Sequence, residues 1–220
     1  MIRQLLLLLA LSLANWHALA FGPRDILWEI VSTCAAQANP DYCTTCRFPR
    51  TDAQCSQSTV CTKSTDVWAM NEQFVAIRDI KMCGCSPGFV HGLVLPRAAV
   101  RGVEDAARPD GIWSFAWQIA KEHLPESPIA LVVNPSRLRS QDQLHVHLVK
   151  LRPGLDELIQ RNTVGQVTDL ADVWQLAASG ASARGLDDYG VLVTQSAAAT
   201  FAVVVTATSP EGMFTEWKCR

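Results

Sequence analysis

The chain has 220 residues, 49% of them hydrophobic, which suits one globular domain with a full apolar core. Its formal net charge at pH 7 is only −2, so the composition excludes a strongly basic nucleic-acid-binding protein, and no nucleic-acid partner is expected.

The first 20 residues have the pattern of a secretory signal peptide. A basic Arg3 precedes an apolar run from Leu5 to Ala14, and small residues at Ala18 and Ala20 form an A-x-A cleavage pattern. The apolar run is shorter than the roughly 20 residues of a membrane span. We therefore expect a secreted or periplasmic protein, with an uncleaved N-terminal anchor at the membrane as the open alternative.

All eight cysteines follow this segment, and seven of them lie between Cys34 and Cys85. An even number of cysteines behind a signal peptide predicts disulfide bonds, although the sequence does not assign the pairs. The spacing Cys43-x-x-Cys46 with Cys83-x-Cys85 leaves a zinc knuckle open as an alternative. A redox CxxC is disfavoured, because no strand-then-helix context surrounds it.

In the N-terminal part of the mature chain, the sequence pattern predicts a helix followed by a loop region that is cross-linked by disulfides. Pro23 fits the first turn of a helix over residues 21–38, whose apolar face is formed by Ile26, Ile30, Val31 and Cys34. From residue 39 to about residue 66 the chain is polar and has no helical or strand period. We predict residues 21–66 as an N-terminal elaboration and residues 67–220 as the catalytic domain.

The remaining elements alternate between strand-like and helix-like patterns. Strands are predicted at residues 73–80, 88–95, 129–133, 143–151, 189–195 and 200–206, the last two paired across 196–199. Helices are predicted at residues 111–123, 153–162 and 168–178, with a small-residue linker at 180–185. Segregated strand pairs with helices between them predict an α+β fold with a largely antiparallel sheet.

The strand QLHVH, residues 143–147, concentrates polar side chains on one face. Because side chains alternate along a strand, Gln143, His145 and His147 share a face, and the opposite, buried face takes Leu144, Val146 and Leu148. The preceding turn adds amide, hydroxyl and guanidinium groups at the edge of the sheet, from Asn134, Ser136, Arg137, Arg139 and Ser140. Cations and donors beside an imidazole suit chemistry on a phosphoryl group.

Two other interpretations of the same residues stay open. The polar face could be a solvated face of an antiparallel sheet. A zinc site on His145 and His147 would need a third ligand, for which the mature chain offers only His91 and His123 among its other histidines. On sequence grounds His91 is better explained as a structural histidine. Arg137 and Arg139 could belong to a solvated turn or bind phosphate.

The block from Trp113 to Pro153 resembles the core of the CDP-diacylglycerol pyrophosphatases, a secreted or membrane-anchored branch of the histidine-triad superfamily. The similarity rests on the Trp-x-x-x-Trp helix, the apolar strand ending in Asn134, the Ser-Arg turn and the His-x-His strand ending in LRP. GFVHGLVLPR before the helix, DDYGVLVTQ after it and Cys219 near the end extend it collinearly from about Val67 onward.

This resemblance implies roles for individual residues. The superfamily motif alternates three histidines with apolar residues, and its slots fall on Gln143, His145 and His147. His145 would be the nucleophile that attacks the α-phosphorus, and His147 would position it and donate to phosphate oxygens. Asn134 and Ser140 match positions that orient the nucleophile or bind phosphate. Gln143 departs from the motif, which has histidine in this slot. Glutamine cannot carry a proton as histidine can.

We therefore expect a histidine-triad-like hydrolase of a phosphoric anhydride that converts CDP-diacylglycerol to CMP and phosphatidate through a nucleotidyl-histidine intermediate. Its partner would be a nucleotide-lipid substrate at a membrane surface, and a dimer stays open. No cofactor and no metal are expected. The alternatives are a nucleotidyl transferase using the same intermediate, and a non-catalytic secreted module that binds nucleotide or lipid.

Overall fold

The computed structural model describes residues 23–36, 40–55, 60–196 and 200–219. The predicted signal peptide and the centre of the turn at 197–199 lie outside these residues. Within the described ranges, no helix combines the length and the apolar character needed to cross a membrane.

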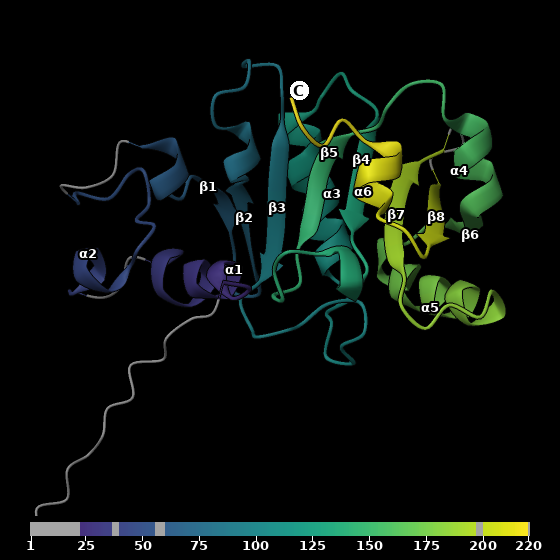
Figure 1. Cartoon of the computed structure of the whole chain (residues 1–220), viewed down its shortest axis with the longest axis horizontal. Coiled ribbons are helices and arrows are strands. Elements are labelled where there is room, and N and C mark those ends of the chain that lie inside the picture. Colours follow the sequence, from purple (N-terminus) through teal and green to yellow (C-terminus); the bar gives the residue numbers. More distant parts are fainter. Residues whose placement is uncertain (1–22, 37–39, 56–59, 197–199, 220) are drawn as a thin grey trace, which may run out of the picture.

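An eight-stranded antiparallel sheet forms the centre of the protein (Figure 1). Its strands are β1 (Val67–Met70), β2 (Phe74–Arg78), β3 (His91–Pro96), β4 (Ile129–Val133), β5 (Val146–Lys150), β6 (Thr163–Val167), β7 (Gly190–Gln195) and β8 (Phe201–Thr206). Their order across the sheet is β1-β2-β3-β5-β4-β7-β8-β6. The predicted α+β class with an antiparallel sheet is therefore confirmed.

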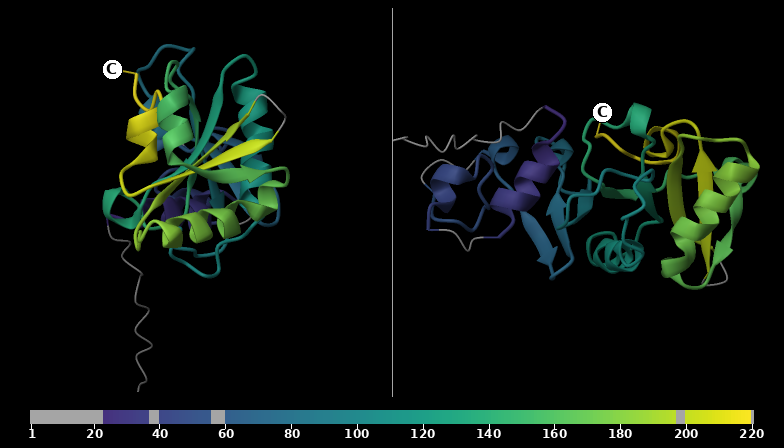
Figure 2. Two further views of the ribbon diagram at one scale, coloured as in Figure 1. Left: turned by 90° about the vertical axis from the view of Figure 1, so that its right-hand side faces the viewer. Right: turned by 90° about the horizontal axis from the view of Figure 1, so that it is seen from below.

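Helices cover both faces of this sheet. They are α1 (Ile26–Glu29), which continues into a π-helical turn (Ile30–Cys34), α2 (Tyr42–Thr45), α3 (Ile112–His123), α4 (Asp156–Asn162), α5 (Val173–Ala183) and α6 (Pro210–Phe214). Single 3₁₀ turns lie at Cys61–Lys63, Ile80–Met82, Ser136–Leu138 and Leu170–Asp172. Helices α1 and α3 lie on opposite sides of the sheet (Figure 2).

One face of the sheet buries the main apolar core against α3 and α5. Trp113 and Trp174, one from each helix, pack with their ring centroids 4.7 Å apart. The histidine segment, which runs into β5, contributes three apolar side chains to this core, those of Leu144, Val146 and Leu148. The predicted division of that strand into two faces is therefore confirmed for its apolar side.

The opposite face carries two smaller apolar clusters, and these position the site. The first packs α1 and the following turn on β2 and β3, with Leu27, Ile30, Val75, Ile77 and Leu93 among its members. The second packs α6 on β4, β7 and β8, with Ala130, Val132, Leu192, Val204 and Phe214 among its members. His147 pairs with Leu93 on one side and with Val132 on the other, so its side chain lies between the two clusters.

Four disulfides join all eight cysteines, which confirms the predicted framework. The pairs are Cys34–Cys46, Cys43–Cys55, Cys61–Cys83 and Cys85–Cys219. Cys43 and Cys46 bond to different partners, so neither a zinc knuckle nor a redox pair forms. Two of the pairs lie before β1, and Cys61–Cys83 links that segment to the turn between β2 and β3. Cys85–Cys219 links the same turn to the C-terminal segment, 134 residues away.

The structure corrects several sequence predictions. Residues 180–185 do not form a linker, because α5 extends to Ala183. Their small side chains allow close packing on β6 instead: a Cβ at Gly180 would meet Val164 at 2.4 Å. The histidine strand begins only at Val146, and it is central, between β3 and β4, and not at an edge. The sequence pattern also misses β1, β6, α2 and α6, which have four or five residues each.

Candidate functional site

Two histidines from neighbouring strands meet in the gap between the clusters. His91 begins β3 and His147 lies in β5, and the antiparallel register places both side chains on the same face. His91 Nε2 lies 2.9 Å from His147 Nδ1. Both rings are buried, so the interpretation of this polar face as solvated is wrong.

His145 extends the same line by one step, just before β5. Its Nδ1 lies 2.7 Å from the backbone carbonyl oxygen of Gln143, and because that oxygen only accepts, Nδ1 carries the proton. Burial lowers the pKa of His145, and the Gln143 carbonyl opposes this shift only in part. The neutral ring therefore has its lone pair on Nε2, the form in which an imidazole is a nucleophile. The side chain is 6% exposed.

The side chain of Gln143 points its hydrogen bonds away from the imidazoles. Its amide nitrogen donates to the carbonyl oxygens of Pro96 and Ala98, at 2.9 and 2.8 Å, and its amide oxygen accepts from the Val100 backbone at 3.3 Å. These three bonds fix the chain that follows β3. Gln143 therefore contributes to the site through its backbone carbonyl, which orients His145.

Asn134, at the end of β4, closes the other side of His147. Its amide nitrogen lies 3.4 Å from His147 Nε2 and donates to Glu211 Oε2 at 2.8 Å. Its amide oxygen accepts from the Ser209 hydroxyl at 2.7 Å. Asn134 is thus held by α6 and the residue that caps it, and it presents an N–H to the His147 ring.

The hydrogen bonds of His91 fix the tautomers of the pair. His91 Nδ1 lies 3.1 Å from the Trp217 carbonyl oxygen, so this nitrogen carries the proton. Burial, and to a smaller extent the nearby Lys81 ammonium, lower the pKa of His91 to about 3. Its neutral Nε2 must then accept a proton from His147 Nδ1. His147, whose pKa burial also holds well below its usual value, is left with a lone pair on Nε2.

Two buried carboxylates and one lysine surround this histidine pair. Asp79 Oδ2 and Glu211 Oε1 each lie 3.4 Å from His91 Nε2, and Glu211 Oε1 lies equally far from His147 Nδ1. Lys81 Nζ contacts Glu211 Oε1 at 2.5 Å. Burial raises the pKa of Asp79 above its ordinary value, whereas the charge of Lys81 opposes that rise. The cluster thus brings two carboxylate oxygens within 3.4 Å of the ring nitrogens of the histidine pair.

The remaining predicted substrate-binding residues do not join the histidines in this structure. Arg137 has a side chain that is 70% exposed, and it pairs with Asp188 at 2.8 Å. Arg139 is buried and makes a bidentate pair with Glu104, although its charge contributes to lowering the pKa of His145. Ser140 is exposed. Of the four, only Asn134 contacts a histidine.

The structure also brings in residues that the sequence pattern missed. His91 was explained there as structural, and Asp79, Lys81 and Glu211 were not singled out. His91 lies 56 residues from His147, and Glu211 lies in a helix that the pattern did not predict. The only available signal was a histidine on the strand that neighbours the His-x-His strand, which becomes informative once the strand pairing is known.

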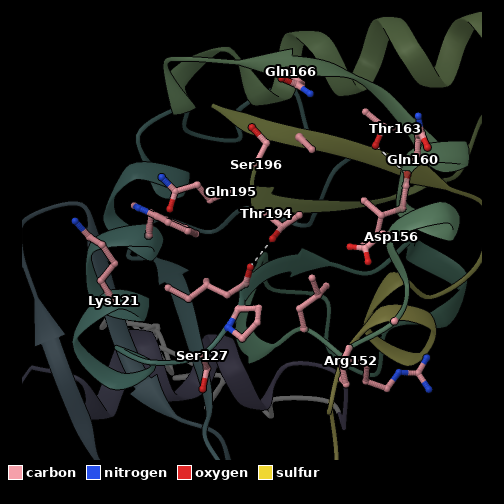
Figure 3. A pocket seen from close by; sticks show the side chains of 18 of the residues that line it. Lys121, Ser127, Arg152, Asp156, Gln160, Thr163, Gln166, Thr194, Gln195 and Ser196 are labelled. Carbon is pink, nitrogen blue, oxygen red and sulfur yellow. Dashed lines mark hydrogen bonds between the residues drawn. The ribbon is translucent and has the colours of Figure 1, made fainter. Parts of the chain in front are cut away.

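A cavity lies away from the histidines, at the ends of β4, β5 and β7 (Figure 3). It has a volume of about 1170 Å³, and polar side chains of α4, β6 and the chain after β7 project into it. Thr194 bridges its wall by donating to the Ile129 carbonyl oxygen at 2.8 Å. Neither a histidine nor a cysteine is among the described residues that line it. The histidine cluster therefore lies outside this cavity.

Comparisons with known proteins place these features in a family. A family model described as CDP-diacylglycerol pyrophosphatase matches residues 22–186. A probable CDP-diacylglycerol pyrophosphatase of Mycobacterium leprae is 34% identical over a segment covering 31% of this chain and 30% of that protein. A CDP-diacylglycerol pyrophosphatase of Mycobacterium tuberculosis (strain ATCC 25177 / H37Ra) is 33% identical over 26% of each chain. The chain thus spans less than a third of the length of these relatives in the matched segments.

Proposed function

The chain belongs to the CDP-diacylglycerol pyrophosphatase family, and from this premise we propose that it hydrolyses CDP-diacylglycerol to CMP and phosphatidate. The reaction breaks a phosphoric anhydride. The match of the family model over residues 22–186 supports this proposal, since it includes the histidine strand together with Asp79, His91 and Asn134.

In the proposed mechanism His145 is the nucleophile. Its Nε2 attacks the α-phosphorus, the bond from that phosphorus to the bridging oxygen breaks, and phosphatidate leaves. Water then attacks the same phosphorus, the P–N bond to the imidazole breaks, and CMP is released with His145 restored. The observation that carries the assignment is the bond between His145 Nδ1 and the Gln143 carbonyl, which turns the Nε2 lone pair outward from the backbone.

The other strand histidine is assigned a positioning role. The His145 and His147 rings lie edge to face with centroids 4.8 Å apart, and His147 is itself held between His91 and Asn134. Donation from His147 to a phosphate oxygen requires a proton on Nε2. The hydrogen bonds of the free protein put that proton on Nδ1, so the ring must change tautomer before it can donate.

We extend the proposal to the histidine-triad-like relationship and to the place of action. Gln143, His145 and His147 occupy the three alternating slots of that motif, and the intervening apolar residues face the core. Four disulfides suit an oxidising compartment, which supports a secreted or periplasmic protein acting on a nucleotide-lipid at a membrane surface. The backbone carbonyl of Gln143 orients His145, while its side chain holds the neighbouring loop.

The experiment is to measure CMP release from CDP-diacylglycerol in mixed detergent micelles, with His145→Ala beside the wild type. We expect a fall of at least about 10³-fold in kcat, the scale seen when a covalent nucleophile is removed. His123→Ala is the matched control, because His123 is the last residue of helix α3 and stacks on Trp68 of the edge strand β1.

Each result bears on a named alternative. Equal rates for wild type and His145→Ala would refute the nucleophile assignment. No release by either protein would favour a binding module. Adding a simple alcohol separates hydrolysis from transfer: a CMP ester that replaces most of the CMP would identify a nucleotidyl transferase.

A further inference from the structure

The groups around His91 and His147 have the spacing of metal ligands. Asp79, His91 and His147 each offer one ligand atom, and these atoms lie within 4.8 Å of one another. In a tetrahedral zinc site with bonds of about 2.0–2.1 Å, neighbouring ligand atoms lie roughly 3.3 Å apart. His91 Nε2 lies 2.9 Å from His147 Nδ1, 3.4 Å from Asp79 Oδ2 and 3.4 Å from Glu211 Oε1, so these edges bracket that value.

The orientation of His91 provides an independent observation. Its Nδ1–H donates to the Trp217 carbonyl oxygen, which leaves a lone pair on Nε2 in the middle of the cluster. Metal-binding histidines are held in this way, with the second ring nitrogen fixed by a backbone carbonyl or a carboxylate. The bond to Trp217 therefore fixes both the tautomer and the angle of a ligand.

The carboxylates add to this arrangement. The Lys81 backbone N–H donates to Asp79 Oδ1 at 2.9 Å, which leaves Oδ2 turned toward His91. The lone pair of His91 Nε2 thus faces two carboxylate oxygens. Among the described residues, His147 Nδ1–H is the only group that donates a hydrogen bond to this nitrogen. A cation placed between these atoms would replace repulsion between acceptors by coordination.

We infer that this cluster binds one divalent transition-metal ion of the zinc class through Asp79 Oδ2, His91 Nε2 and His147 Nδ1. Glu211 Oε1 lies beside these three ligands, 3.4 Å from both ring nitrogens, where it is paired with the Lys81 ammonium at 2.5 Å. Imidazole nitrogens with carboxylate oxygens are a donor set that zinc prefers. The sequence left His145 and His147 without a third ligand, whereas the structure pairs His147 with His91 and adds Asp79.

Binding changes the tautomer of His147. The metal takes the Nδ1 lone pair, so the single proton of the neutral ring moves to Nε2, and no proton is lost from the ring. In that form Nε2–H can donate to a phosphate oxygen beside His145. This last consequence rests on the proposed function, whereas metal binding itself does not.

The test is a zinc titration of the full, oxidised chain in competition with a chromogenic chelator. All eight cysteines are in disulfides, so thiolates cannot supply the binding. We expect one equivalent of Zn²⁺ per chain. Loss of an outer-shell partner weakens metal binding by roughly 10–100-fold, so the loss of a ligand in His91→Ala should weaken it by at least about 100-fold. His123→Ala is the matched histidine control and should bind as the wild type does.

Two further variants keep the test decisive if His91→Ala does not fold. Asp79→Asn has nearly the same shape and should bind zinc at least about tenfold more weakly. Lys81→Met removes a positive charge that repels a cation beside this cluster and should bind zinc more tightly, the opposite direction. Circular dichroism of each variant verifies the fold.

Cobalt gives a readout of geometry that is independent of activity. Co²⁺ in the wild type should show the strong visible absorption of tetrahedral coordination, and His91→Ala should lose it. Absence of saturable zinc binding by the wild type would overturn the inference. So would unchanged binding in His91→Ala or Asp79→Asn, or weak octahedral absorption with Co²⁺. None of these readouts uses CDP-diacylglycerol, so a failure here is distinct from a failure of the proposed reaction.

Discussion

Strands β1–β3 lie beneath a segment that is held by disulfides, whereas strands β4–β8 lie between helices that bury extensive apolar surface. The segment before β1 buries a smaller apolar cluster on β2 and β3, and two disulfides, Cys34–Cys46 and Cys43–Cys55, close loops within it. A third, Cys61–Cys83, links it to the turn between β2 and β3. The apolar half buries α3 and α5 without any cysteine. Cross-links thus stabilise the region in which burial of apolar surface contributes least.

The histidine cluster lies where these two regions meet. The cross-linked region supplies Asp79, Lys81 and His91 from β3 and the chain before it, and the apolar region supplies Asn134 and Glu211. Cys85–Cys219 joins the regions two residues after Trp217, whose carbonyl oxygen holds His91. We therefore expect Cys85–Cys219 to hold the geometry of the site, whereas Cys43–Cys55 stabilises only the cross-linked region.

The largest effect should come from removing the joining disulfide. Chain-entropy estimates give about 4–5 kcal/mol for cross-links that close loops of 100 residues or more, and about 3 kcal/mol for loops near 15 residues. Cys85→Ser with Cys219→Ser should therefore lose more free energy of unfolding than Cys43→Ser with Cys55→Ser, measured by urea denaturation. The two pairs close separations of 134 and 12 residues.

Activity separates these two double variants more sharply. We expect CMP release to fall at least about tenfold without Cys85–Cys219, because misplacing a catalytic group by about 1 Å can cost as much as 10²-fold. It should stay near the wild-type rate without Cys43–Cys55, when both proteins are folded at the assay temperature. Equal losses of activity would contradict the division of roles.

A smaller effect is expected at Gln143. Gln143→His restores the residue of the wider motif, but it removes the amide that serves three backbone groups of the loop after β3. Leaving a buried backbone group without a partner costs about 1–3 kcal/mol, so the variant should be less stable by about that amount or more. We expect no gain in CMP release, and a faster enzyme would show that the first slot limits the reaction.

The smallest effect concerns the Arg139–Glu104 pair, which lies beside the site. The guanidinium of Arg139 holds the pKa of Glu104 below its ordinary value. Because the pKa is lower in the folded state, the pair stabilises the protein above the ordinary glutamate pKa, and this contribution is lost as the pH falls through the lowered value. Glu104 is 40% exposed on its side chain, so we expect less than about 1 kcal/mol.

The check is Glu104→Gln, compared with wild type by denaturant unfolding at two values of pH. The difference in the free energy of unfolding should be present at neutral pH and should shrink in acid, below the lowered pKa. A difference that grows in acid would contradict the sign of this pKa shift.

Much of the architecture follows from periodicity in the sequence. Strand β4 matches its predicted bounds, helix α3 differs by one residue at its start, and the alternation around His145 places Leu144, Val146 and Leu148 in the core. The elements that were missed, β1, β6, α2 and α6, have four or five residues each. Their stability comes from tertiary packing and not from a local pattern.

The candidate site was predictable only in part, for a related reason. His145 and His147 share a strand, so the period of two brings them together. His91 reaches His147 only through the pairing of β3 with β5, and Glu211 reaches it through a short helix. Arg137 and Arg139 were near in sequence, but Asp188 and Glu104 pair with them, and these carboxylates are 51 and 35 residues away. Non-local electrostatic pairs of this kind leave no local trace.

The central claim is that His145 forms a covalent bond to the nucleotide. The most direct measurement is intact-protein and peptide mass spectrometry after rapid mixing with CDP-diacylglycerol and a denaturing alkaline quench, which preserves phosphorus–nitrogen bonds. We predict a cytidylyl adduct on His145 in the wild type and in His123→Ala, and no adduct in His145→Ala. CMP release at the wild-type rate by His145→Ala, or an adduct on another residue, would contradict this account.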